Sequence, residues 1–379
     1  GSWIIDGTLA NIAWAPSLVS YNLSWEKIRT WNAGVDFGLF NNRLTGSFDY
    51  YIRKTDDMVG PSEKLPVALG TAVPSSNNTN LKTFGWELEL MWKDRLNNGL
   101  NYSARFTLAD SRTKITRYSN PSGLIDGFYA GKYVGEIWGY ETIGIAQSDQ
   151  EMAEHIGRLV NGGQSNLGQD WKAGDIMYKD LNEDGKIDAG SRTLQDHGDL
   201  KRIGNSTPRY NVGLELAADW KGFDIRMFWQ GTLKRDYFQG SYYFWGANGR
   251  QGPWFSTALK GHDDYFRNDE ASPLGTNLNS YYPRPLFNTD KNQQSQTKYL
   301  QDASYLRLKN LQIGYSLPHN IVQKMGMQNL RIFASGENLF TITSLIDFFD
   351  PESIEGGRWG HGKVYPLSRT FSFGLNVTF

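Results

Sequence analysis

SRTFSFGLNVTF, residues 368–379, alternates from Thr370 onward between apolar residues and small or polar ones. Neighbouring residues of a β-strand point to opposite faces, so this segment would form a strand with one apolar and one polar face. The apolar face would carry Phe371, Phe373, Leu375, Val377 and Phe379. Such a face has to be covered, either by a second protein layer or by lipid.

The composition narrows the classes of function. The 379 residues include 39 Lys and Arg against 40 Asp and Glu, so no basic surface for a nucleic-acid partner is expected. The lack of cysteine excludes disulfides, iron–sulfur clusters and thiolate zinc sites. Aromatic residues make up 14% of a chain of negative mean hydropathy, which predicts many half-exposed rings. No window approaches 18 consecutive apolar residues, so only a β-barrel could place this chain in a membrane.

The alternation of the last strand recurs along the chain. With that strand included, it predicts nine strands, the other eight at residues 31–39, 43–52, 85–92, 101–108, 210–220, 223–231, 305–317 and 329–342. Periodicity by itself leaves a β-sandwich and a barrel open, because both have strands with one apolar face.

The connections between these strands differ in length in a regular way. Short turns at 40–43, 95–99, 221–222 and 318–327 alternate with long connections such as 56–80, 237–303 and 344–367. Outer-membrane barrels have short periplasmic turns and long extracellular loops, whereas nothing in a sandwich sorts its loops this way. The pattern therefore favours a barrel whose first strand here begins outside the cell and whose last strand ends in the periplasm.

Two further features refine the barrel. The apolar residues occupy even positions at Leu306 and Leu308 but odd positions at Leu311 and Ile313. One extra residue is needed to keep them on one face, which predicts a β-bulge at Lys309 and Asn310. The face opposite the apolar residues would carry many charges, and desolvating them in a small closed barrel would cost several kcal/mol each. A wide lumen avoids this cost, so we expect the nine strands to be part of a larger ring. These charged residues are Glu87, Glu89, Arg105, Glu215, Asp224 and Arg226.

Several stretches have specific counterparts in a known family. They are LSWEKIRTWNAGVDFGLFNNRLTGSFDYYIRKTDDM (23–58), GDIMYKDLNEDGKID (174–188), YLRLKNLQIGYSLP (305–318), NLRIFASGENLFTIT (329–343) and YPLSRTFSFGLNVTF (365–379). In these stretches, and in their order, the chain resembles the SusC-like (RagA-like) TonB-dependent outer-membrane transporters of Bacteroidetes. The resemblance implies an all-β, antiparallel transmembrane barrel of about 22 strands, of which residues 1–379 would be the C-terminal part. The N-terminal plug and the first half of the barrel would then lie outside this chain.

The resemblance also implies a function and partners. The expected activity is import of oligosaccharides or peptides across the outer membrane, with a SusD-like surface lipoprotein as a lid and energy from TonB through the N-terminal part. Lipid would contact the apolar face, and Phe379 matches the C-terminal aromatic residue that the barrel-insertion machinery reads. The alternatives are a passive surface-binding or structural barrel and a soluble β-sandwich lectin. An upstream plug and TonB box would distinguish the importer from the passive barrel.

The segment DLNEDGKID follows the spacing of a calcium-binding loop. Its oxygens would come from Asp180, Asn182, Asp184, the Lys186 carbonyl and Asp188, around a turn at Gly185. Ser191 stands where such loops have a bidentate glutamate, so a pair of ligand oxygens is missing. The sequence predicts a structural Ca²⁺ or Mg²⁺ site in an extracellular loop, or alternatively a tight turn capped by its own Asp and Asn side chains.

Aromatic residues cluster in the long loops. We expect them to contact substrate or the lid protein, since exposed rings stack on sugars and anchor interfaces, with packing between loops as the alternative. Ser148 followed by Glu151 predicts a capped surface helix over 148–160. The five histidines are far apart and no hydrolase or nucleotide-binding motif occurs, so we expect no enzyme. The candidate rings are Trp138, Tyr140, Tyr242, Tyr243, Trp245, Trp254, Tyr281, Tyr282 and Trp359.

Overall fold

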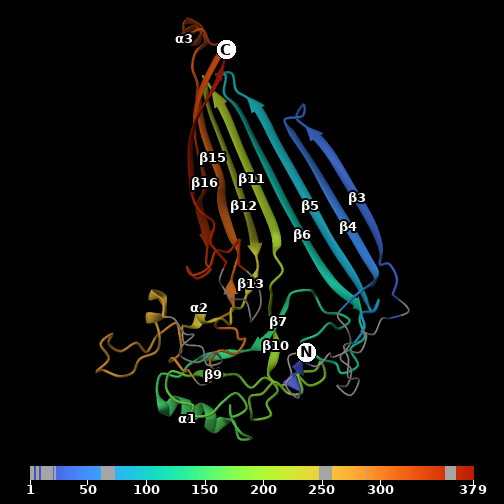
Figure 1. Ribbon diagram of the computed structural model, residues 1–379, viewed down its shortest axis with the longest axis vertical. Coiled ribbons are helices and arrows are strands. Elements are labelled where there is room, and N and C mark those ends of the chain that lie inside the picture. The colour runs from blue at the N-terminus through green and yellow to red at the C-terminus, as the bar shows by residue number, and fades with distance from the viewer. Residues whose placement is uncertain are drawn as a thin grey trace.

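The computed structural model describes residues 4–5, 8–9, 20, 23–60, 73–246, 258–287, 289–354 and 364–379. One antiparallel sheet dominates, with nine strands in the order β17-β16-β15-β12-β11-β6-β5-β4-β3 (Figure 1). Every predicted strand is present, and each pairs with the predicted strands that come before and after it in the chain, which confirms the nine-strand pattern. The strands are β3 (Lys27–Leu39), β4 (Leu44–Met58), β5 (Thr79–Arg95), β6 (Asn101–Arg117), β11 (Arg209–Trp220), β12 (Phe223–Lys234), β15 (Tyr305–Ser316), β16 (Asn329–Thr343) and β17 (Thr370–Thr378).

The connections sort to two ends of the sheet as the sequence predicts. β11 and β12 are joined by Lys221 and Gly222, both at positive φ, the two-residue turn whose twist matches that of the strands. The connection from β15 to β16 contains the short helices α3 (His319–Val322) and η4 (Gln323–Met325). Figure 1 shows α3 and the C-terminus at one end of the strands and the long connections at the other.

The two faces of the sheet differ as the alternation predicts. On β17, Phe373 is 84% and Leu375 64% exposed, so no second protein layer of the described residues covers this face. The soluble sandwich is therefore wrong, because it requires these side chains to be buried between two sheets. The other face bears a hollow of about 460 Å³ whose wall includes Glu87 and Glu89, and Arg105 pairs with Glu89 at 2.7 Å. Apolar side chains thus face outward and charged ones line a concave interior.

An ion pair on the inner face explains a glycine in β15. Arg331 of β16 donates from Nε to Asp224 of β12 at 2.9 Å, across the intervening strand. A Cβ at Gly314 would collide with both side chains. Only glycine leaves room for this pair to cross β15.

The predicted bulge in β15 is confirmed. Phe228 pairs with Asn310 and Trp229 pairs with Leu308, so Lys309 is the extra residue. Its ammonium group lies 2.9 Å from Glu352.

Arg307, two residues before, donates to both carboxylate oxygens of Asp350 at 2.9 Å and to Glu352. The bulge and its neighbour thereby tie the segment after β16 to the inner wall.

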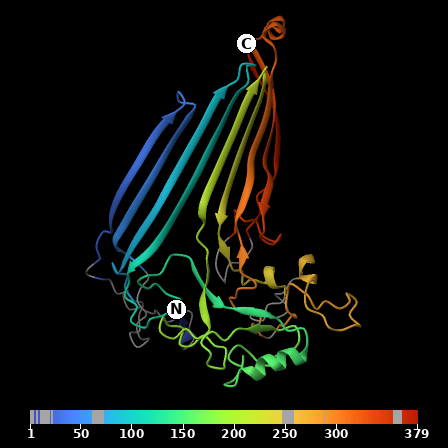
Figure 2. The same ribbon diagram turned by 180° about the vertical axis from the view of Figure 1, so that it is seen from behind.

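The long connections fold into a separate layer at one end of the sheet (Figures 1 and 2). The main hydrophobic cluster of the described residues lies in this loop layer and not beneath the sheet; it includes Ile176, Tyr178, Phe244 and Tyr299. The elements of the layer are β7 (Glu136–Tyr140), β8 (Thr142–Ile145), β9 (Ile176–Tyr178), β10 (Leu200–Asn205), β13 (Asp236–Tyr237), β14 (Gln301–Asp302), α1 (Asp149–Arg158), α2 (Tyr242–Trp245) and η3 (Lys260–Asp263); β1 (Ile4–Ile5) and β2 (Thr8–Leu9) form a separate pair. The loops are therefore a folded unit with its own core.

The helix predicted at 148–160 is α1. The Ser148 hydroxyl accepts a hydrogen bond from the Glu151 backbone N–H at 3.1 Å, as predicted. The Glu151 carboxylate accepts from the Gln147 N–H at 2.7 Å, one residue before the position expected for a capping box. Met152 is the buried anchor of the helix. No helix in the described part of the chain is long and apolar enough to cross a membrane.

Candidate functional site

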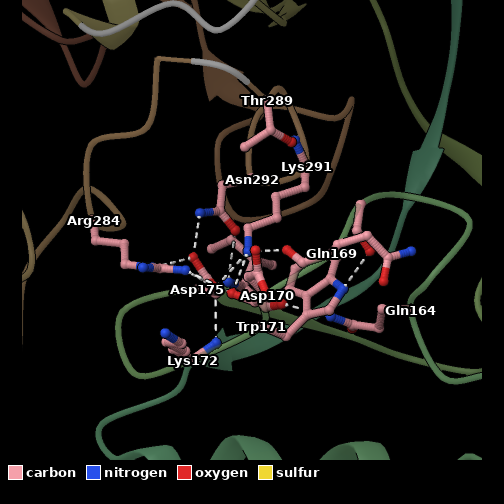
Figure 3. Close-up of polar contacts among 12 residues, drawn as sticks. Gln164, Gln169, Asp170, Trp171, Lys172, Asp175, Arg284, Thr289, Lys291 and Asn292 are labelled. Carbon is pink, nitrogen blue, oxygen red and sulfur yellow. Dashed lines mark hydrogen bonds and ion pairs between the residues drawn. The ribbon is translucent and has the colours of Figure 1, made fainter.

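A buried carboxylate holds the loop layer together (Figure 3). Asp175 is fully buried and accepts hydrogen bonds from Arg284 at 2.7 and 2.8 Å and from Asn292 at 2.8 Å. The ammonium group of Lys291 lies 2.8 Å from the same carboxylate, and the Lys172 N–H donates to it at 2.9 Å. Arg284 is 109 residues from Asp175 in sequence. The cluster therefore joins two loops that no local pattern connects, and sequence reasoning missed it for that reason.

The Asp175 carboxylate faces two cations, Arg284 and Lys291. Burial opposes ionisation of Asp175, but the hydrogen bonds from Arg284, Lys291 and Asn292 outweigh it and hold the pKa of the carboxyl below its usual range. Burial lowers the pKa of Lys291, which also donates to the backbone carbonyls of Gln169 and Asp170 at 2.8 and 2.9 Å. The cluster is thus a rigid frame for the loops and offers no free group for binding.

The predicted calcium loop forms a tight turn. Asp180 accepts from the Gly185 N–H at 2.8 Å, and Asp184 accepts from the Lys186 N–H at 3.1 Å. These bonds belong to the capped turn that the sequence offered as the alternative. The Lys186 ammonium group lies 2.6 Å from Asp188, where a metal ion would otherwise supply positive charge.

The fit of this loop to a cation is mixed. Oδ1 of Asp180 is buried and makes no hydrogen bond within the described residues, which favours an ion. Among all the described residues, no three His, Cys, Asp or Glu side chains are arranged to hold a metal. In this loop, Asn182 and backbone carbonyls could add oxygens. The cation site stays a prediction.

A cavity of about 490 Å³ lies in the loop layer between β7, β10 and the segments at 125–135 and 294–295. We call it the Trp138 cavity, because the partly buried ring of Trp138 and the buried ring of Tyr140 line it. Both rings are among the candidates chosen from the sequence. Asp126, Arg192 and Ser295 also line it, and no sequence pattern singled them out.

The charged groups of the Trp138 cavity each have a hydrogen-bond partner. Arg192 donates from Nε and Nη2 to the two oxygens of Asp126 at 2.9 and 2.8 Å. Lys132 donates to two backbone carbonyls at 3.1 and 2.8 Å, and burial lowers its pKa. Glu136 accepts from the hydroxyl of Tyr129 at 2.6 Å, and burial together with this bond raises the pKa of Tyr129 to about 12. The cavity is therefore polar, and its charged side chains are held by hydrogen bonds.

A second, mainly apolar cavity of about 240 Å³ lies against the rings of Trp245 and Tyr282. His262 lines it and is fixed by two hydrogen bonds, one from the Leu259 N–H at 2.9 Å and one to the Tyr243 carbonyl at 3.0 Å. Burial lowers the pKa of this imidazole, which keeps it neutral.

Three other candidate rings, Tyr242, Tyr243 and Tyr281, pack against aromatic neighbours. Tyr281 packs edge-on against Tyr282 and Tyr299, and Tyr242 stacks on Tyr243 with ring centroids 4.5 Å apart. Trp254 and Trp359 lie outside the described residues. Contact of these rings with substrate or lid stays a prediction.

Long antiparallel strands with an apolar outer face, a charged concave face and connections sorted by length define a segment of an outer-membrane β-barrel. The family described as TonB dependent receptor-like, beta-barrel matches residues 7–339, and the chain belongs to this family. This confirms the resemblance seen in the sequence. The family is one of receptors and transporters and not of enzymes.

The chain spans about a third of the length of the curated relatives it matches. It is 29% identical to TonB-dependent receptor P3 of Formosa agariphila, covering 94% of this chain and 34% of that protein. It is 26% identical to TonB-dependent receptor SusC of Bacteroides thetaiotaomicron, covering 96% of this chain and 33% of that protein. Among solved structures, the RagAB peptide transporter superposes with a TM-score of 0.68 at 24% identity, covering 94% of this chain and 36% of the other. The fold is therefore shared with such transporters.

Proposed function

We propose that this chain forms the C-terminal barrel segment of an outer-membrane active importer of oligosaccharides or peptides. The observation that carries the proposal is a folded loop layer, with its own core and cavities, at one end of a barrel wall whose inner face is charged. A passive structural barrel has no need for such a layer. The remainder of the barrel would pair with the outer edges of β3 and β17, which end the sheet.

The loop layer would capture the ligand. The Asp175 cluster keeps the cavities in shape before the ligand arrives, which limits the entropy lost on binding. Arg307 and Lys309 hold residues 344–354 against the inner wall, near the entrance to the lumen. A SusD-like lipoprotein would close over the loops, and TonB, acting on a plug in the N-terminal part of the whole protein, would open the route inward.

Uptake in the native organism tests this function. Cells with the whole transporter, with a version lacking the TonB-interacting segment, and with none would be given fluorescently labelled oligosaccharide and peptide pools. Accumulation that requires both the transporter and that segment is expected. Equal uptake without the segment would instead identify a passive barrel. Co-purification from detergent extracts would show whether a surface lipoprotein accompanies the transporter.

A further inference from the structure

We propose that the outward face of β3 to β6 binds the phosphate groups of lipid A, the glycolipid that anchors lipopolysaccharide in the outer leaflet of the outer membrane. The site is a row of cations that lie directly opposite one another on adjacent strands, and we call it the cationic row. The proposal goes beyond import, because it concerns the lipid around the barrel and not the transported molecule. The row consists of Arg29 on β3, Lys54 on β4, Lys82 on β5 and Lys114 on β6.

The register of the strands forms this row. Each member of the cationic row pairs with the next one, from β3 to β6. Residues directly opposite each other on antiparallel strands point to the same face. The neighbouring row on that face, two residues closer to the periplasmic turns, contains Trp31, Ile52 and Phe84. Trp31 is exposed on the apolar side of the sheet, so the cationic row faces lipid and not the lumen.

The cationic row lies at the height of the lipid headgroups. Arg29 precedes Leu39, the last residue of β3 at the periplasmic turn, by ten residues. Ten strand residues span about 33 Å, and a strand tilt of about 40° reduces this to a height of about 25 Å. The apolar band of an outer-membrane barrel is also about 25 Å tall. The cations therefore lie at the outer boundary of the band, where the outer-leaflet phosphates are.

The protein relieves the repulsion within the row only in part. Like charges directly opposite each other destabilise a sheet. Arg29 donates to Asp56 on the neighbouring strand. Lys54, Lys82 and Lys114 form no ion pair with any side chain that the structure describes. A phosphate group in front of the row would supply the missing negative charge.

A fifth cation lies at the β6 end of the row. Tyr133 pairs with Lys114 in an isolated bridge, and the Lys114 ammonium group lies 5.6 Å from the centre of the Tyr133 ring. The exposed Arg112 guanidinium lies 4.1 Å from the same ring centre. A cation over an aromatic face keeps its charge, so Arg112 adds to the positive potential of the row.

The cations gather on one part of the wall and do not form a belt around it. At the same end of β12 and β16, the outward face carries the exposed apolar residues Leu233 and Ile342. A general preference of Lys and Arg for headgroups would place cations there as well. Lipid A suits the uneven distribution, because its phosphates would lie on the row while its acyl chains pack on the apolar row that contains Trp31 and Phe84.

Lipid binding to the delipidated, detergent-solubilised whole transporter tests the proposal. The probes are diphosphoryl lipid A and the same lipid A with its phosphates removed, measured by native mass spectrometry, and inorganic phosphate, measured by calorimetry. The test variant is Lys54→Gln with Lys82→Gln, and Lys54→Arg with Lys82→Arg keeps the charges. The matched control is Arg53→Gln with Lys93→Gln, which removes two cations from the same two strands but from the inner face. Heat-modifiable migration on gels confirms that each variant has a folded barrel.

We expect diphosphoryl lipid A to bind, with affinity lowered about tenfold or more by the two Gln substitutions in the row. The Arg pair and the inner-face control should keep the affinity of the unaltered transporter, and added salt should weaken binding because the cations are accessible to solvent. Equal binding of the dephosphorylated lipid, or an equal loss in the inner-face control, would overturn the proposal. Inorganic phosphate binding as tightly as lipid A would also overturn it, since the site would then be one for free anions. None of these results depends on TonB or on the transported substrate, so failure of uptake in cells would count only against the proposed function.

Discussion

Replacing Asp175 by asparagine should loosen the loop layer far more than its single atom change suggests. The carboxylate is fully buried beside Arg284 and Lys291, and Asp175→Asn would remove the negative charge that both cations contact. Breaking a buried ion pair by removing one partner costs about 3–5 kcal/mol, and we expect a loss of this size in the free energy of opening of the layer. Removing a cation as well, in Asp175→Asn with Lys291→Met, should recover part of that loss.

The chain offers a matched control in Glu141. This carboxylate also lies in the loop layer and also contacts two cations, Lys179 at 3.1 Å and Lys201, but 28% of its side chain is exposed. Water compensates an exposed pair, so Glu141→Gln should cost less than about 1 kcal/mol. The comparison shows whether the loss of stability depends on burial of the carboxylate or on the number of its ionic contacts.

Hydrogen exchange monitored by mass spectrometry measures the effect. Peptides covering 172–178 and 284–296 of the whole transporter should lose protection in Asp175→Asn, while peptides of the barrel strands should not change. Loss of protection equal to that of Glu141→Gln would refute the reasoning. A loss spread evenly over the barrel would do the same, because it would show that the layer is not a separate unit.

The same cluster predicts a dependence on pH. Its hydrogen bonds hold the pKa of Asp175 below the unfolded value of about 3.9, so the stabilisation is complete above that value and is lost as pH falls through the folded pKa. Protection of the loop peptides should therefore be flat at neutral pH and should fall in acid. Asp175→Asn should remove this acid-dependent step.

Three other predictions address the barrel and the loops. Phe373→Arg should lower the free energy of unfolding of the barrel in lipid vesicles by up to about 2–4 kcal/mol, whereas Ser372→Arg on the inner face should lower it little. Equal losses would contradict the assignment of faces. Gly314→Ala should lower the same free energy of unfolding by about 1–3 kcal/mol, because the new methyl group displaces Arg331. An unchanged midpoint of urea unfolding would argue against the crossing ion pair. If the predicted cation site exists, calorimetry should detect Ca²⁺ binding that Asp180→Ala abolishes, and no binding to the unaltered protein would exclude it.

The barrel wall was determined by the sequence. Alternation of side chains in strands has a period of two, so residues 371–379 define their own apolar face whatever they pack against. Lys309 could be recognised as a bulge because the parity of its neighbours changes there. The alternation of short and long connections predicted which end of the strands carries the turns and which end carries the long loops. All of these are local properties that a chain carries before it folds.

Only the tertiary structure decided the loop layer. Asp175 meets Arg284 across 109 residues, and the Trp138 cavity closes where the segments at 125–138, at 192–206 and at 294–295 meet. These loops have no repeating period, so nothing near Trp138 in sequence shows whether its ring will face a cavity or a core. Their partners are selected by long-range packing and by pairing of buried charges, which exist only once the loops have folded against one another.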